Sequence, residues 1–206
     1  MTTFYFVRHG KTELNKGNCF QGGGIDSPLL PEGVQQAREL GRYLSDTLFD
    51  TAVVSTQKRA MGTANYLLTE NRQLNGLTLG YHDGLRELGF GEREGQKVDL
   101  SDPQTIYLRE QPHLYDPSAF NGETYDALLS RSLSVIERLE AAYPQGNVLV
   151  VAHGVVLLVL INYLMGEEKS GWRKNGPLDN TSLTVLQKTA AGTRLQRFND
   201  TAYRAK

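Results

Sequence analysis

The chain has 206 residues, within the size range of a single domain, and 39% of them are hydrophobic, enough for a full core. Its 22 basic and 23 acidic residues leave a net charge of −1, which excludes a generally basic surface for nucleic acid or for a membrane. The single cysteine, Cys19, excludes an internal disulfide and favours a reducing compartment. The longest apolar run, Val155 to Ile161, is far too short to span a bilayer. We therefore expect a cytoplasmic protein with one domain over residues 1–206.

Apolar runs and amphipathic stretches follow one another along the chain and predict both strands and helices. Runs rich in β-branched and aromatic residues predict strands at 4–7, 51–54, 77–81, 148–152, 183–186 and 194–198. Apolar residues at three-to-four spacing predict helices at 31–49, 57–69, 122–143 and 155–164. The buried face predicted for the first of these helices consists of Val34, Ala37, Leu40, Leu44 and Leu48.

Three stretches fit neither pattern. The glycines at 22–24 either present backbone N–H groups to a ligand or serve as a flexible connection. Residues 85–95 mix charges with glycine and predict a structured loop. Residues 96–121 form an excursion in which Ser101 or Asp102, before Pro103, fits a helix start. We expect this excursion to act as a lid-like insertion that covers the site and selects the substrate.

Two strand ends share one pattern. Val7-Arg8-His9-Gly10 and Val151-Ala152-His153-Gly154 both place a histidine and then a glycine after a buried strand. Arg59 lies just beyond the carboxyl end of a third strand, in the first turn of a helix. Because ligands of α/β sheets bind at the carboxyl ends of strands, we expect two histidines and two arginines at one edge.

These four side chains fit phosphoryl chemistry. Arginine forks match phosphate oxygens and stay charged, and nearby positive charge lowers the pKa of an imidazole, which keeps it neutral. A neutral histidine can attack phosphorus, while the second histidine and the arginines stabilise the transition state. The departing alkoxide needs a proton donor, for which a carboxylic acid is the usual group. Glu87 is our candidate, and Glu92 and Glu94 are weaker ones.

The order of the motifs resembles the histidine phosphatase superfamily, in its phosphoglycerate mutase-like branch. The matching stretches are Arg8-His9-Gly10-Lys11-Thr12-Glu13-Leu14-Asn15 with Gln21-Gly22 and Asp26-Ser27-Pro28-Leu29, then Ser55-Thr56-Gln57-Lys58-Arg59-Ala60 with Thr63-Ala64, Glu87-Leu88-Gly89-Phe90-Gly91 through Glu94-Gly95, Gly122-Glu123-Thr124 and Val151-Ala152-His153-Gly154. Lys11 stands where the family often has Glu, and Thr124 where it often has Ser. Sugar-phosphate mutases of the family usually carry Glu-Arg-His-Tyr-Gly at the donor loop, so Glu87-Leu88-Gly89-Phe90-Gly91 looks like the phosphatase branch.

The resemblance implies a three-layer α/β/α fold with a central, mostly parallel sheet, and no metal or organic cofactor. By position His9 would be the phosphorylated nucleophile and Glu87 the proton donor, with Arg8, Arg59 and His153 forming the phosphate pocket. The remaining pocket residues implied by the family are Asn15, Gln21, Gly22 and Gly154. The expected partner is a small-molecule phosphate ester, with no nucleic acid and no membrane, and the sequence carries no signal for an oligomeric state.

Two other phosphate-binding motifs do not match this sequence. A P-loop needs a glycine five positions before Gly10, where Tyr5 stands, and a cysteine phosphatase needs an arginine six positions after Cys19, where Ile25 stands. No His, Asp and Glu cluster has metal-ligand spacing, and His82 and His113 are interpreted as ordinary loop residues. Two alternatives stay open: a cofactor-dependent mutase of the phosphoglycerate mutase type, and an inactive scaffold that binds phosphorylated ligands.

Overall fold

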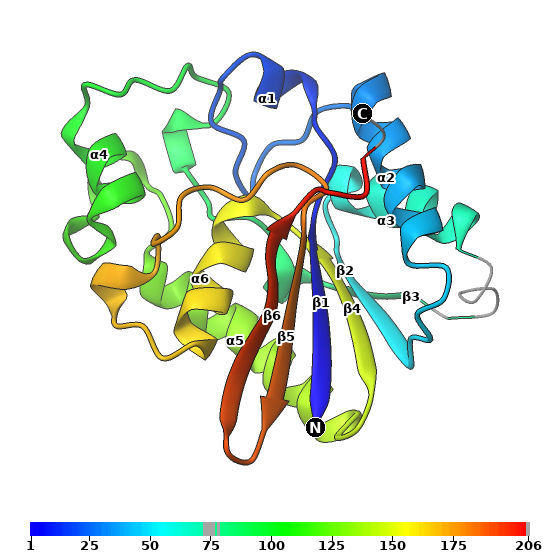
Figure 1. Ribbon diagram of the computed structural model, residues 1–206. Helices are drawn as coiled ribbons and strands as arrows, with labels where there is room; N and C mark the ends of the chain where they lie inside the picture. The colour runs from blue at the N-terminus through cyan, green and yellow to red at the C-terminus, as the bar shows by residue number, and fades with distance from the viewer. Residues whose placement is uncertain (72–76, 78, 205–206) are drawn as a thin grey trace.

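The computed structural model describes residues 1–71, 77 and 79–204 and is organised around a central sheet (Figure 1). Its strands are β1 (Thr2–Arg8), β2 (Thr51–Ser55), β3 (Leu79–His82), β4 (Asn147–Ala152), β5 (Leu183–Thr189) and β6 (Gly192–Asp200). They are arranged in the order β3-β2-β4-β1-β5-β6. The first four in that order are parallel, while β5 and β6 form an antiparallel hairpin at one edge. The expected mostly parallel sheet is confirmed, and the two strands predicted at 183–186 and 194–198 form its edge hairpin.

Helices cover both faces of the sheet. Successive side chains of β1 point to opposite faces, and apolar side chains are buried on both. Phe4 and Phe6 point into the core formed with α5 (Tyr125–Ala142) and α6 (Gly154–Leu164). Val7, on the other face, packs into the core formed with α2 (Pro31–Tyr43) and α3 (Lys58–Glu70). The result is the three-layer α/β/α fold that the resemblance implies. The short helices are α1 (Glu13–Lys16), α4 (Pro103–Glu110), η2 (Asp83–Leu85), η3 (Gly91–Arg93), η4 (Pro112–Leu114), η5 (Ser118–Phe120) and η6 (Lys169–Gly171).

The predicted helix over 31–49 is wrong at its carboxyl end. The helix ends at Tyr43, and Leu48, which we placed on the buried face, is 64% exposed. Polar residues at 45–47 favour turns over helix, and the turn carries Phe49 back into the core. There its ring meets Tyr5 edge-on, with 5.0 Å between the ring centroids. The helix therefore ends before the amphipathic pattern does, and the chain turns so that Phe49 packs against Tyr5.

The other elements follow the predictions closely. The predicted helix over 122–143 begins at Tyr125, because the Thr124 hydroxyl accepts from the N–H of Ala127 at 3.2 Å and caps it. Residue 78 of the predicted strand 77–81 lies outside the described residues, and β3 covers Leu79–His82. Across the part of the chain that the structure describes, no helix is long and apolar enough to cross a membrane.

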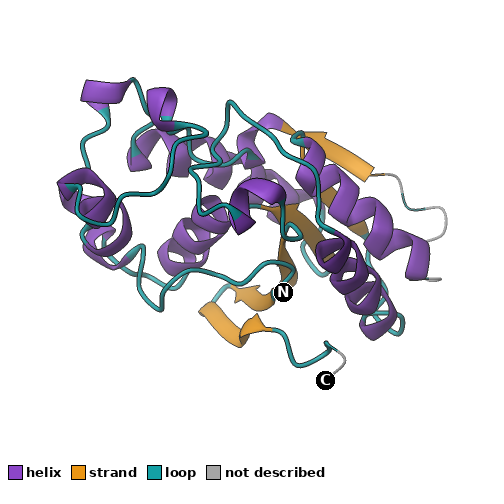
Figure 2. Cartoon of the chain, turned by 90° about the horizontal axis from the view of Figure 1, so that it is seen from above, coloured by secondary structure: helices purple, strands orange, loops and turns teal. Residues whose placement is uncertain are grey.

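The excursion over 96–121 folds into one helix, α4, and two 3-10 turns, η4 and η5. Asp102 caps α4 by accepting from Thr105 N–H at 2.7 Å, as the sequence predicts. Arg93 ties the excursion to the preceding loop, since it pairs with Asp102 at 2.6 Å and lies 3.9 Å from the centre of the Phe120 ring. Seen from above, the loops that follow the strands extend over the carboxyl edge of the sheet (Figure 2).

Candidate active site

The two strand-end histidines lie together because β1 and β4 are paired in parallel register. Val7 pairs with Val151 and Arg8 with Ala152, so the next residue on each strand is a histidine. The rings of His9 and His153 are 5.1 Å apart between centroids. Both side chains are buried, at 2% and 0% exposure. The expectation that these histidines meet at one sheet edge is therefore confirmed.

The tautomer of His9 follows from its hydrogen bond. Its Nδ1 lies 2.7 Å from the carbonyl oxygen of Gly10, which can only accept, so Nδ1 carries the proton. The other ring nitrogen, Nε2, is left with a free lone pair. Burial, followed by the charges of Arg59 and Arg8, holds the pKa of His9 well below its usual value of 6.5. His9 is consequently a neutral, oriented imidazole, although burial contributes more than the neighbouring charge that the sequence emphasised.

His153 is fixed in the opposite tautomer. Arg59 donates from Nε to His153 Nδ1 at 3.1 Å, so the ring proton is on Nε2, which donates to Ser55 Oγ at 2.7 Å. Burial, then the positive charge of Arg59, lowers the pKa of His153 well below the usual value. Ser55 ends β2, so its place at this edge follows from the same strand-end rule, but sequence reasoning did not single it out.

Arg59 is fully buried, and its guanidinium binds the glycine-rich loop. It donates to the carbonyl oxygen of Ile25 at 2.9 Å and to that of Gly22 at 3.1 Å, and it pairs with Asp26 at 3.1 Å. In the glycine stretch, the N–H of Gly23 donates to the Leu88 carbonyl oxygen and that of Gly24 to Glu94, both at 3.1 Å. These N–H groups are bonded within the protein, so neither a ligand cradle nor a flexible connection describes them. A Cβ atom at Gly22 would lie 2.5 Å from the carbonyl oxygen of Leu88, so the loop is closely packed.

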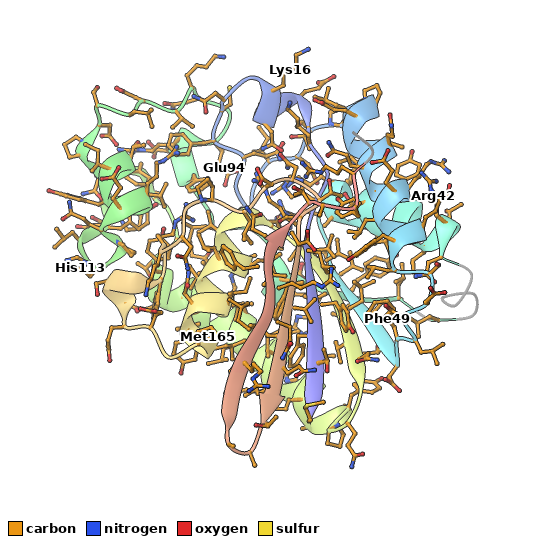
Figure 3. All side chains as sticks on the ribbon, viewed as in Figure 1. Lys16, Arg42, Phe49, Glu94, His113 and Met165 are labelled. Atoms are coloured by element: carbon orange, nitrogen blue, oxygen red, sulfur yellow. The ribbon has the colours of Figure 1, made fainter. Side chains whose placement is uncertain are left out.

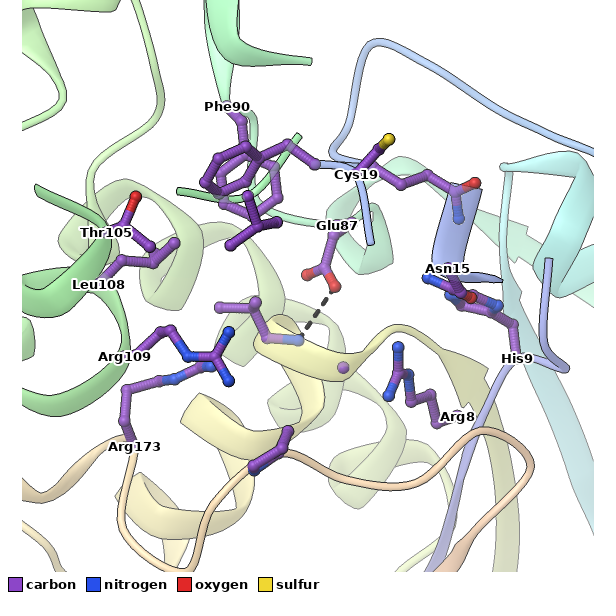
Figure 4. Close-up of a pocket in the computed structure, with 16 residues that line it drawn as sticks. Arg8, His9, Asn15, Cys19, Glu87, Phe90, Thr105, Leu108, Arg109 and Arg173 are labelled. Atoms are coloured by element: carbon purple, nitrogen blue, oxygen red, sulfur yellow. Dashed lines mark hydrogen bonds between the residues drawn. The ribbon is translucent and has the colours of Figure 1, made fainter. Parts of the chain in front are cut away.

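Glu87 is held at the start of α6 by three backbone N–H groups. Its Oε1 accepts from Leu88 at 2.9 Å and from Val156 at 3.0 Å, and its Oε2 accepts from Val155 at 3.0 Å. The N-terminus of a helix is a favourable place for a carboxylate. These bonds aim Glu87 into the cavity beside His9 and Arg8 (Figure 4).

A cavity of about 170 Å³ joins most of the predicted site residues (Figure 4). The predicted residues that line it are Arg8, His9, Asn15, Gln21, Glu87 and Gly154. Two buried donors at its wall, Arg8 Nε and Gln21 Nε2, have no hydrogen-bond partner. Buried donors are normally paired, so these two are placed for an anionic ligand.

The remaining predicted residues lie outside this cavity lining. Arg59 and His153 bond to each other beside His9 and do not line the cavity. The carbonyl oxygen of Gly22 accepts from the Arg59 guanidinium. Glu94 accepts from the N–H groups of Gly24 and Phe90, both at 3.1 Å, so it is a structural residue of the loop.

The other two histidines and the possible metal ligands lie apart from the site. His113 is at the outer margin of the molecule (Figure 3), and His82 Nδ1 accepts from Gly84 N–H at 3.0 Å. Among the described residues, no group of three His, Cys, Asp or Glu side chains could hold a metal ion.

Sequence reasoning missed several residues that the cavity contains. Arg109 and Arg173 line it, as do apolar side chains that include Phe20, Phe90 and Leu108. Asn180 was also missed: its Nδ2 donates to the His9 carbonyl oxygen at 3.1 Å and to Asn15 Oδ1 at 3.2 Å. Phe90 belongs to the donor-loop motif but was given no role, and the others carry no motif, because each comes from a loop or excursion whose path depends on the fold.

The fold and the strand-edge histidines together define an α/β protein built for phosphate chemistry. The family model of the histidine phosphatase superfamily (branch 1) matches residues 4–201, and the chain belongs to this superfamily. It is 34% identical to the phosphatase PhoE of Bacillus subtilis over 200 residues, which are 97% of this chain and 95% of PhoE.

Two solved structures share the fold. Bacillus stearothermophilus YhfR superposes with a TM-score of 0.86 at 27% identity, covering 97% of this chain and 98% of that one. The phosphoglycerate mutase of Bacillus anthracis superposes with a TM-score of 0.83 at 30% identity, covering 98% and 94%. The fold is therefore phosphoglycerate mutase-like, and the chain is a phosphomonoester hydrolase of this superfamily.

Proposed function

We propose that this hydrolase cleaves small phosphate monoesters in two steps through a phosphohistidine at His9. The observation that carries the proposal is the fixed tautomer of His9, with Nδ1 bonded to Gly10 and Nε2 free beside the unpaired Arg8 Nε. In the first step Nε2 attacks phosphorus, the P–O bond to the alcohol breaks, and Glu87 gives its proton to the departing oxygen. In the second step water attacks phosphorus, the N–P bond breaks, and Glu87 takes a proton from that water.

The positive groups around His9 would stabilise the charge that develops on the phosphoryl oxygens. Arg8 and Gln21 supply the unpaired donors, and Asn15 and Gly154 complete the lining. Arg59 and His153 would act from behind His9, where the charge of Arg59 already lowers the pKa of the imidazole. Gly22 would contribute indirectly, since its carbonyl oxygen helps to hold the Arg59 guanidinium.

The natural substrate is a small molecule in this proposal. The cavity is about 170 Å³, and residues 96–121 contribute Val98, Thr105, Leu108 and Arg109 to its wall. We therefore keep the proposal that this segment is a lid-like insertion in a single domain, which closes over the substrate. A cytoplasmic location and the absence of a nucleic-acid partner stay predictions of the sequence.

Mutase-type phosphoryl transfer is the second candidate, because the solved phosphoglycerate mutase of Bacillus anthracis is 30% identical to this chain. The sequence at the donor loop, Glu87-Leu88-Gly89-Phe90-Gly91, favours hydrolysis instead. The two activities differ in whether water or a second hydroxyl takes the phosphoryl group from His9, so one acceptor assay separates them.

The test is hydrolysis of 4-nitrophenyl phosphate in the presence of EDTA by the wild type, His9→Ala and His113→Ala. We expect turnover by the wild type, a loss of roughly 10³-fold or more in His9→Ala, and no change in His113→Ala, whose side chain is exposed. Wild type quenched in alkaline detergent should carry a phosphoryl group that is stable in base and lost in acid, and His9→Ala should lack it. Full activity in a folded His9→Ala would refute the mechanism, and phosphoryl transfer to an added hydroxy acid without hydrolysis would establish the mutase.

A further inference from the structure

Two arginines that the proposed chemistry does not use lie at the end of the cavity away from His9. Arg109 is on α4, and Arg173 follows η6, so the fold brings together two segments far apart in sequence. Figure 4 shows both guanidinium groups at one end of the cavity, Arg8 and His9 at the other, and Glu87 between them.

Neither of these arginines has an acidic partner in the described part of the chain. Two buried donors of Arg173, Nε and Nη1, make no hydrogen bond. Glu167, six positions before Arg173 in sequence, pairs with the neighbouring Lys174 at 2.8 Å instead. Leaving two buried donors of a cation unpaired is costly, and two arginines in one cavity repel each other. Both costs are removed when an anion binds between them.

Apolar side chains also line the cavity, in addition to Glu87. Phe90 and Leu108 line the cavity from the donor loop and from α4, and Val155 lines it from the start of α6. These side chains offer no hydrogen-bonding groups to a ligand that passes between the ends. The cavity is therefore cationic at both ends, and the wall between them carries the Glu87 carboxyl together with apolar side chains.

We propose that Arg109 and Arg173 form a second anion subsite and that the substrate is a phosphate monoester with a second oxyanion, a carboxylate or a phosphate, on a short spacer. This inference rests on the proposed function, because it takes His9 as the end of the cavity where the ester is cleaved. The planar guanidinium groups can bind either oxyanion in a bidentate manner.

The experiment compares matched substrates with and without the second charge. One series contains phosphate esters of ω-hydroxy acids with two to five carbons, each paired with its neutral carboxamide. A second series contains the corresponding diol bisphosphates, each paired with its monophosphate. For the wild type we expect at least one spacer length at which the doubly anionic member has a kcat/KM roughly tenfold or more above its neutral partner, mainly through a lower KM.

The variants are Arg109→Gln, Arg173→Gln and, as a matched control, Lys174→Gln. Loss of the preference in both arginine variants, with the neutral esters hydrolysed as before, is the expected result. Lys174→Gln removes a charge at the adjacent position but does not line the cavity, so it should keep the preference.

Three outcomes overturn the inference: no preference in the wild type at any length, a preference that survives both arginine substitutions, or an equal loss on charged and neutral esters. Failure of the proposed function is recognised separately, because it would abolish turnover of the neutral esters or make turnover independent of His9. Whichever series shows the larger preference identifies the second oxyanion.

Discussion

Replacing Glu87 by glutamine separates its proposed role as a proton donor from its role in holding the start of α6. The amide oxygen can take the place of Oε1 and accept from Leu88 and Val156. The amide nitrogen then faces the N–H of Val155, which loses its acceptor. The variant keeps most of the local structure but has no proton to give to the leaving oxygen.

The two consequences have different magnitudes. General acid catalysis contributes about 10²- to 10⁴-fold, or about 3–5 kcal/mol of activation free energy. One buried N–H without an acceptor costs about 1–3 kcal/mol of unfolding free energy. We therefore expect a folded, mildly destabilised enzyme whose defect depends on the leaving group.

The assay compares kcat/KM for 4-nitrophenyl phosphate and for 4-nitrophenethyl phosphate, which have similar size. The nitrophenolate departs without a proton, so Glu87→Gln should change its kcat/KM little, whereas the alkyl ester should lose about 10²- to 10⁴-fold. Glu92→Gln is the control, since Glu92 is exposed and bonds to Asn121 instead. An equal loss on both esters would show that Glu87 only positions α6, and an intact rate on the alkyl ester would exclude it as the donor.

Two further predictions concern stability. Because burial keeps the pKa of His9 and of His153 well below 6.5 in the folded state, the unfolded chain takes up protons that the folded chain does not. The unfolding free energy should therefore fall as the pH drops below about 6.5, by up to about 1.4 kcal/mol per pH unit for each histidine. Urea titrations at pH 7.5 and 5.5 measure this loss, which should be smaller in His9→Gln. A loss of unfolding free energy in His9→Gln equal to that of the wild type would contradict the prediction. Gly91→Ala should destabilise far more than Gly176→Ala in the same assay: both have positive φ, but a Cβ at Gly91 would lie 2.0 Å from the Phe120 carbonyl oxygen and one at Gly176 in open space. Equal effects would mean that φ strain alone, about 1–2 kcal/mol, governs both sites.

The phosphate end of the site could be predicted because it depends on short-range patterns and one topological rule. A buried strand that ends in His-Gly is visible in sequence, and parallel pairing of β1 with β4 then brings His9 and His153 together. The same rule places Arg59 at the start of α3. The sequence could not show that Arg59 turns its guanidinium to the carbonyl oxygens of Gly22 and Ile25, since that contact depends on the path of a loop.

The other end of the cavity could not be predicted for the same physical reason. Arg109 lies on the exposed side of a short helix, and Arg173 lies in a stretch with charged and glycine neighbours, so each looks like a solvated charge. Only the packing of the excursion against the α6 side of the sheet brings them to one cavity. The error at Leu48 has a related origin, because a tertiary contact of Phe49 overrides the local helical pattern.

The groups proposed for chemistry and the proposed second anion subsite lie on different parts of the fold, so substitutions in the two regions should affect different kinetic constants. His9, His153 and Arg59 lie at the ends of β1 and β4 and at the start of α3, where strand register and the helix N-terminus fix them. Glu87 lies in the loop after η2 and is fixed by its bonds to the start of α6. The proposed second anion subsite lies on α4 and in the segment after η6, outside the sheet. Changes in those segments alter what the cavity binds without moving Nε2 of His9 relative to Arg8 and Glu87. Substitutions there should therefore appear mainly in KM, and substitutions at the strand ends mainly in kcat, which is the pattern that the matched ester series measures.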